Sequence, residues 1–207
     1  DTGEAMFAAA VGYDWFYDVL SDEQKKFIEE NTLRLGIEPI RSAYYGKLHV
    51  ENRFGALSGG NFVTANTNFN QVVNGGMVLA AMAFAGVYPE ECFDAASKAI
   101  QSLTYVLPMY EPVGAWEEGP NYWTYSSEYI GYLISTLVTS CGSDYAILTH
   151  PGFDITPYYA MYLDSWQGIN NFSDTEPGSF DSACFAFFGK YKNDPAISYQ
   201  RYTAIKD

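Results

Sequence analysis

Several long segments of this 207-residue chain place apolar residues three or four positions apart. In residues 4–20, for example, this spacing puts one wide apolar face on a helix. No segment of useful length alternates apolar and polar residues as a half-buried strand would. The sequence therefore predicts an all-α fold in which helices bury their apolar faces against one another.

Capping and helix-breaking residues indicate where the helices begin and end. Ser21 and Gln24 have the spacing of a capping box, and Gly36 stands where it would end the same helix. Pro89 suits the first turn of a later helix, and Thr156 before a proline is typical of an N-cap. The expected helices cover residues 4–20, 22–35, 70–86, 89–107, 122–140, 157–165 and 179–190, with a short helix near 40–46. The first two should form an antiparallel hairpin.

Two irregular stretches separate these helices. Residues 36–68 are rich in Gly, Asn and Ser, and residues 108–121 are rich in Glu, Pro and Gly. Loops of this length within a compact domain usually carry function. We therefore expect the functional residues in these two loops, at one end of a helical scaffold.

The balance of charge limits the choice of partner. Eleven Lys and Arg against 25 Asp and Glu give a net charge of −14. A nucleic-acid-binding surface is basic, so this balance argues against nucleic acid, and it provides few cations for a highly sulfated polymer. Aromatic residues make up 17% of the chain, and Tyr and Trp rings combine an apolar face with a polar group. This excess favours a groove that binds sugars.

The sequence gives no sign of membrane insertion or of a disulfide framework. The longest apolar run, residues 77–87, is too short to span a bilayer, and no signal-peptide pattern opens the chain. Cys92, Cys141 and Cys184 are widely spaced, which indicates small buried residues on helices, although one disulfide stays open. Both ends look cut, so we expect residues 1–207 to be one helical domain of a longer protein.

Two segments resemble the heparinase II/III-like polysaccharide lyases. Residues 64–77 (TANTNFNQVVNGGM) are similar to the family's NNWNxVxxxG stretch, with Thr67 and Phe69 in place of Asn and Trp. Residues 112–125 (PVGAWEEGPNYWTY) are similar to its PDGxxxEGxxYWxY segment, with Val113 in place of Asp. Residues 10–18 and 170–174 resemble the AxxYDWxYD and FNFxD stretches, and the four segments follow the family's order.

The resemblance implies an incomplete (α/α) toroid of antiparallel helix hairpins, with long loops that line a groove. It also implies β-elimination of a uronic acid-containing polysaccharide, in the periplasm or outside the cell. In full-length members a C-terminal β-sandwich domain follows the toroid and supplies further catalytic groups. No cofactor is expected, and the two histidines of the chain are too far apart for a metal motif.

β-Elimination needs one group that neutralises the substrate carboxylate and another that moves a proton. Asn68 is the candidate for the first role, and the resemblance places Tyr122 at the position of the catalytic tyrosine. His49, in the first long loop, is a further candidate for base or carboxylate ligand. The expected substrate-binding residues are Asn66, Asn70, Trp116, Glu118, Trp123 and Tyr125, of which Tyr125 is also the alternative proton carrier. Plainer roles stay open, since Asn68 and Asn70 can cap a helix and Tyr122 can pack in a core.

Two other functions also stay open. A non-catalytic or degenerate glycan-binding protein would bind sugar without turnover, and Thr67, Val113 and the low basic count are its signs. An (α/α) glycoside hydrolase would need two facing carboxylates. Glu117 and Glu118 are adjacent, so their side chains point in different directions and are poorly placed for that role.

Overall fold

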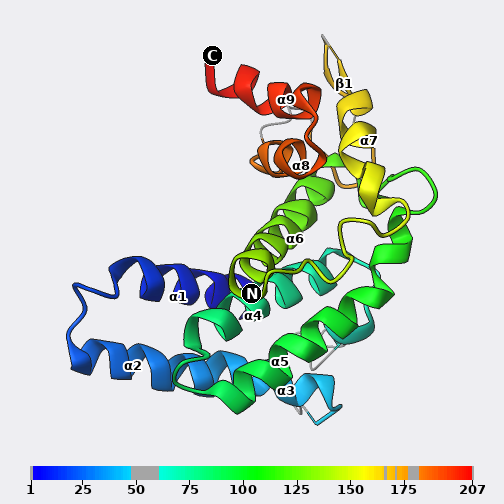
Figure 1. The fold of residues 1–207 in the computed structure, drawn as a ribbon. Helices are drawn as coiled ribbons and strands as arrows, with labels where there is room; N and C mark the ends of the chain where they lie inside the picture. Colours follow the sequence, from blue (N-terminus) through cyan, green and yellow to red (C-terminus); the bar gives the residue numbers. More distant parts are fainter. Residues whose placement is uncertain (1, 48–60, 166, 171, 177–181, 207) are drawn as a thin grey trace.

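The computed structural model describes residues 2–47, 61–165, 167–170, 172–176 and 182–206. These residues are mostly helical, which confirms the predicted all-α class (Figure 1). The strands within them are β1 (Asp164–Ser165) and β2 (Gly168–Ile169), which pair in an antiparallel hairpin. The α-helices are α1 (Thr2–Phe16), α2 (Asp22–Thr32), α3 (Glu38–Tyr44), α4 (Asn68–Phe84), α5 (Pro89–Ser102), α6 (Pro120–Cys141), α7 (Thr156–Leu163), α8 (Cys184–Lys192) and α9 (Pro195–Lys206).

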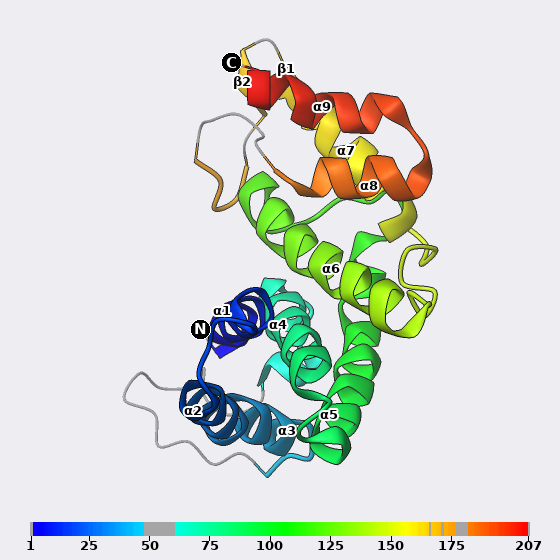
Figure 2. The same ribbon diagram turned by 60° about the vertical axis from the view of Figure 1, so that its left-hand side comes forward.

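Helix α4 is the centre of the fold. It packs against α1, α5 and α6, and nearly all of its residues are buried (Figures 1 and 2). A Cβ atom at Gly75 would lie 2.9 Å from the carbonyl oxygen of Tyr129 in α6, and one at Gly76 would lie 1.9 Å from that of Gly3 in α1. These two glycines therefore allow the backbones of α1 and α6 to approach α4 closely.

Helices α1 and α2 form the predicted antiparallel hairpin (Figure 1). The capping box is confirmed, because the Gln24 N–H donates to Ser21 Oγ (3.2 Å) and the Ser21 N–H donates to Gln24 Oε1 (2.9 Å). The prediction that Gly36 ends the helix is wrong, since the chain continues through a π-helical turn, Leu33–Ile37, into α3. Met6 of α1 occupies the space that a Cβ at Gly36 would need, so close packing explains this glycine.

Of the other predicted helix boundaries, some are confirmed and one is wrong. Pro89 occupies the first position of α5, as predicted, and Gly142 ends α6 in the left-handed conformation. Thr156 is the first residue of α7 rather than its N-cap. Its hydroxyl instead accepts a hydrogen bond from Trp123 Nε1 (2.7 Å) and donates one to the carbonyl of Gly114 (2.6 Å).

The last three helices form a group on the other side of α6 (Figure 2). The helix expected at residues 179–190 corresponds to α8, which covers Cys184–Lys192. Helix α9 was not predicted, because its apolar residues lack clear helical spacing. Among the described residues, no helix is both long enough and apolar enough to cross a membrane. Cys92 and Cys184 are buried and free, as expected, whereas Cys141 is free but exposed.

Candidate functional site

Two of the segments that resemble the lyase motifs meet at the start of α4. The carboxylate of Glu118 accepts two hydrogen bonds from Asn68, one from its backbone N–H (2.8 Å) and one from its side-chain Nδ2 (2.9 Å). Thr67 at the N-cap position makes no capping hydrogen bond with its side chain. Glu118 therefore caps α4 from a loop that lies fifty positions further along the chain.

A third segment contacts the same region. Gly119 has a φ of 91°, and a Cβ atom there would lie 2.4 Å from Thr175 Oγ1 and 2.5 Å from the carbonyl oxygen of Phe172. The backbone N–H of Asn121 donates to Thr175 Oγ1 (3.4 Å). Residues 172–175 therefore lie against the loop that carries Glu118. Helix α6 begins two residues after Glu118, at Pro120.

Asn68 and Tyr122 lie at the same end of the α4–α6 pair. The two helices run in the same direction, because Asn68 contacts Glu118 at one end and Met82 approaches Cys141 at the other. Tyr122 is in the first turn of α6 and is partly buried against the core. The structure thus brings the two main predicted residues to one end of the same helix pair. His49 lies outside the described residues.

The electrostatics of this region are dominated by carboxylates. Burial raises the pKa of Glu118, and its two hydrogen bonds from Asn68 offset part of that effect. Neighbouring Glu117 raises the Glu118 pKa further. In the described part of the chain, no Lys or Arg hydrogen-bonds to Asn68 or Glu118. The region therefore offers a substrate carboxylate neutral donors rather than cations.

Two of the predicted substrate-binding residues are in the core. Trp116 and Trp123 are fully buried. Trp116 stacks on Tyr110 with ring centroids 4.8 Å apart, and Trp123 hydrogen-bonds to Thr156. Neither ring has a face free to stack on a sugar, so the substrate-binding assignment of both is corrected to a packing role.

Asn70 is also structural. It is fully buried, and its Nδ2 donates to the carbonyl oxygens of Phe62 (3.0 Å) and Ser102 (3.1 Å). Its Oδ1 accepts from Asn74 Nδ2 (2.9 Å), and Asn74 Oδ1 accepts from the hydroxyl of Tyr44 (2.7 Å). This network ties α3, α5 and residues 61–64 to α4. Asn70 therefore neither caps α4 nor faces a ligand, which corrects the prediction that it binds substrate.

The remaining predicted residues reach the surface to different extents. Asn66 is exposed, with its amide 3.8 Å from the sulfur of Met109. The hydroxyl of Tyr125 donates to Glu4 of α1 (2.7 Å). Burial raises the pKa of Tyr125, and the hydrogen bond to Glu4 adds to the effect, so the phenolate form is disfavoured. Tyr125 is thus poorly suited to act as a base.

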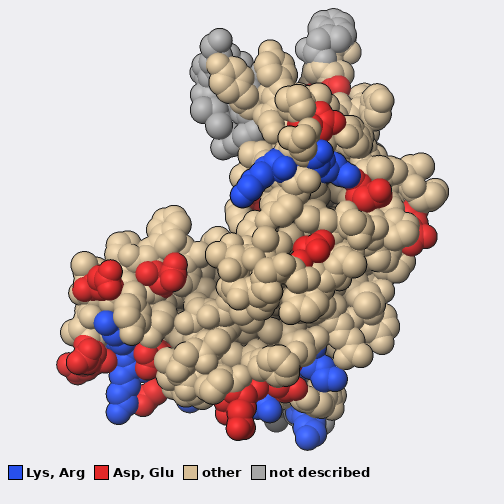
Figure 3. Space-filling model, in the orientation of Figure 1, with Lys and Arg blue, Asp and Glu red and all other residues tan. Residues whose placement is uncertain are grey.

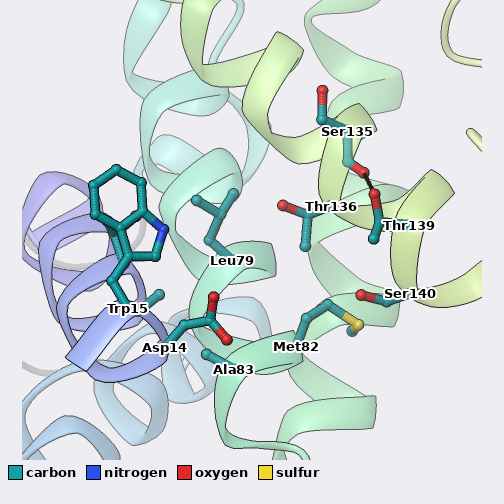
Figure 4. A pocket seen from close by; sticks show the side chains of 11 residues that line it. Asp14, Trp15, Leu79, Met82, Ala83, Ser135, Thr136, Thr139 and Ser140 are labelled. Carbon is teal, nitrogen blue, oxygen red and sulfur yellow. Dashed lines mark hydrogen bonds between the residues drawn. The ribbon is translucent and has the colours of Figure 1, made fainter. Parts of the chain in front are cut away.

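A pocket of about 360 Å³ opens at the opposite ends of α4 and α6, where α1 forms the third wall (Figure 4). It is remote from Asn68 along both helices, so it is distinct from the predicted site. Trp15 and Asp14 of α1 lie on its edge. Both belong to residues 10–18, and the sequence alone did not predict that Trp15 lines a pocket.

Basic side chains of the described residues lie in several separate places. On the face drawn in Figure 3 they lie over α2, α3 and α5 and near α8. Arg41 of α3 is engaged by Asp94 and Glu38, and Lys190 and Lys192 lie in the last turn of α8. Among the described residues, no three His, Cys, Asp or Glu side chains are grouped so that they could hold a metal ion.

Comparison of the chain with models of protein families gives no match, and comparison with curated proteins gives none either. The family resemblance and the role of each site residue therefore stay predictions.

Proposed function

We propose that this chain is the helical part of a polysaccharide lyase-like protein that cleaves a uronic acid-containing polysaccharide by β-elimination. Its helix hairpins would then belong to an incomplete (α/α) toroid. The observation that carries the proposal is the double hydrogen bond between Asn68 and Glu118. It joins the two segments that resemble lyase motifs, and Tyr122 follows four positions after Glu118. Asn68 and Tyr122 both lie in the first turn of a helix, and helices hold catalytic side chains in place more precisely than loops do.

In this proposal Asn68 binds the substrate carboxylate. Its Nδ2 carries two hydrogens, of which Glu118 accepts one, so the second can be donated to a ligand. A neutral amide donor stabilises the negative charge that spreads onto the carboxylate when the C5 proton leaves. Glu118 is a positioning residue, because its two accepted hydrogen bonds hold the Asn68 side chain in one orientation.

Tyr122 is the proposed proton carrier. In the elimination, the C5–H and C4–O bonds break, a C4–C5 double bond forms, and the departing oxygen takes up a proton. In one route His49 takes the C5 proton and the phenol of Tyr122 gives its own proton to the departing oxygen. In the other, the phenolate of Tyr122 takes the C5 proton, and the phenol formed in that way passes this proton to the departing oxygen. With 11 Lys and Arg in 207 residues, the chain is better suited to a polymer whose charge comes from carboxylates alone than to a more highly charged sulfated one. The full-length protein would carry a C-terminal β-sandwich domain and act in the periplasm or outside the cell.

The test uses the full-length protein and a panel of uronate polymers such as alginate, hyaluronan, heparosan and polygalacturonate. Ultraviolet absorbance detects the unsaturated product. We expect Tyr122→Phe to lower the rate roughly 100-fold or more, since it removes a proton-transfer group. The matched control is Tyr105→Phe, because Tyr105 is an exposed tyrosine beyond the end of α5 and should be dispensable. Full activity of Tyr122→Phe would refute its assignment, and no unsaturated product from any polymer would refute the lyase proposal.

A non-catalytic glycan-binding protein is the second candidate. The side chain of Asn68 is only 6% exposed and is already bound by Glu118, so it could serve structure alone. This candidate predicts polymer binding without any unsaturated product. New reducing ends without unsaturation would instead indicate a glycoside hydrolase.

A further inference from the structure

The pocket between α1, α4 and α6 combines an apolar floor with polar walls (Figure 4). Leu79 and Ala83 of α4 form the floor, and the carboxylate of Asp14 stands on the α1 side. On the α6 side, the hydroxyls of Thr136 and Ser140 face the opening. Small-molecule sites have this general construction, in which apolar surface provides contact and a few polar groups provide orientation.

The polar groups of this pocket are free to bind a ligand. In the described residues, the Asp14 carboxylate and the hydroxyls of Thr136 and Ser140 make no hydrogen bond or ion pair with the protein. The hydroxyl of Thr139 differs, because it donates to the backbone carbonyl of Ser135 (2.8 Å) within the helix. Three hydrogen-bonding groups on two facing helices are therefore available at once.

Trp15 adds an aromatic surface at the edge of the pocket. It is 76% exposed, whereas Trp116 and Trp123 are fully buried. Its indole stands beside Asp14 in Figure 4. An exposed tryptophan next to unpaired polar groups is typical of binding surfaces, since the ring offers a large, rigid contact area.

We propose that this pocket binds one neutral sugar residue. The C–H face of a pyranose ring would pack on Trp15, and its hydroxyls would donate to Asp14 and exchange hydrogen bonds with Thr136 and Ser140. The pocket volume of about 360 Å³ lies in the range of small-ligand sites. A uronate is a poor ligand here, because its carboxylate would be repelled by Asp14.

This site is separate from the proposed elimination site. Tyr122 and Thr136 are fourteen positions apart on α6, which corresponds to about 21 Å along a helix. Sugar binding in the pocket therefore does not depend on the chemistry at Tyr122. The two proposals can fail independently.

The test is a titration of the chain with glucose, galactose, mannose and maltose, followed by ligand-observed NMR and by tryptophan fluorescence. We expect binding of at least one of these sugars, and a loss of affinity of tenfold or more in both Trp15→Ala and Asp14→Asn. Phe93→Ala is the matched control, because Phe93 is also 76% exposed but lies on α5. Circular dichroism checks that each variant is folded, and Trp15→Phe, which keeps an aromatic ring, should retain most of the binding.

Three results would overturn the proposal. They are the absence of binding by every neutral sugar, equal binding by wild type and Trp15→Ala, and a preference for glucuronate or for a quaternary amine over neutral sugars. Tyr122→Phe separates the two sites, since it should abolish elimination and leave the affinity of the pocket for sugar unchanged.

Discussion

Replacing Gly76 by Ala should destabilise this protein, although the same change stabilises most helices. In a helix interior Ala is favoured over Gly by about 1 kcal/mol. At Gly76, however, the new Cβ atom would lie 1.9 Å from the carbonyl oxygen of Gly3 and 2.6 Å from its carbonyl carbon. Both are backbone atoms, so no change of rotamer relieves the contact. Helix α1 must move away from α4.

The size of the effect follows from that movement. Cβ atoms essentially never approach such atoms within 3.0 Å, so α1 must shift by about 1.1 Å, the difference between 3.0 and 1.9 Å. The shift loosens the packing of Met6, Ala10 and Tyr13, which are buried in the core. Overpacking at the upper end of the usual range costs about 3 kcal/mol, which outweighs the gain in helix propensity and leaves a net loss of about 2 kcal/mol. For a chain of this length, that loss lowers Tm by about 4–8 °C.

The matched control is Gly12→Ala in α1, where a new Cβ atom meets nothing within 4 Å. We expect this variant to be more stable than wild type by up to about 1 kcal/mol. Urea unfolding followed by circular dichroism measures both variants. If Gly76→Ala were as stable as wild type, or more stable, the close packing of α1 on α4 would be refuted.

Three further predictions concern single side chains. Burial raises the pKa of Glu118 in the folded protein, so its contribution to stability is full below its pKa in the unfolded chain and is lost as pH rises through its pKa in the folded protein. As pH falls from about 7 to 4, urea unfolding should therefore show the stability difference between wild type and Glu118→Gln shifting in favour of wild type. Asn70→Ala leaves several buried polar groups unpaired and should lower the free energy of unfolding by about 3 kcal/mol. Its control is Asn66→Ala at an exposed position, which should change the free energy of unfolding by less than about 0.5 kcal/mol. A thiol reagent at neutral pH should label one cysteine per native chain, Cys141, and three after denaturation, because the other two are buried and burial raises the pKa of Cys92 to about 11; rapid labelling of a second native thiol would contradict this.

Part of the candidate site could be predicted from the sequence. The sequence alone predicts functional residues in residues 64–77 and 112–125, and the structure brings these two segments together through Asn68 and Glu118. The roles of Trp116 and Trp123 could not be read in the same way. A tryptophan looks the same in the sequence whether it lines a groove or fills a core. Only the contacts with Tyr110 and Thr156 in the folded protein show that these two rings belong to the core.

Local features of the chain were decided by the sequence itself. Helical spacing, the capping box at Ser21 and the proline that opens α5 depend on residues a few positions apart, so they are visible without the fold. Tertiary structure alone decided what lies opposite each residue. It turned Gly36 from an expected helix end into a contact with Met6, and Asn70 from an expected ligand into a buried link between helices. It also formed the pocket beside Trp15, because that pocket is made by three helices that are distant in the sequence and meet only when each packs on its neighbours.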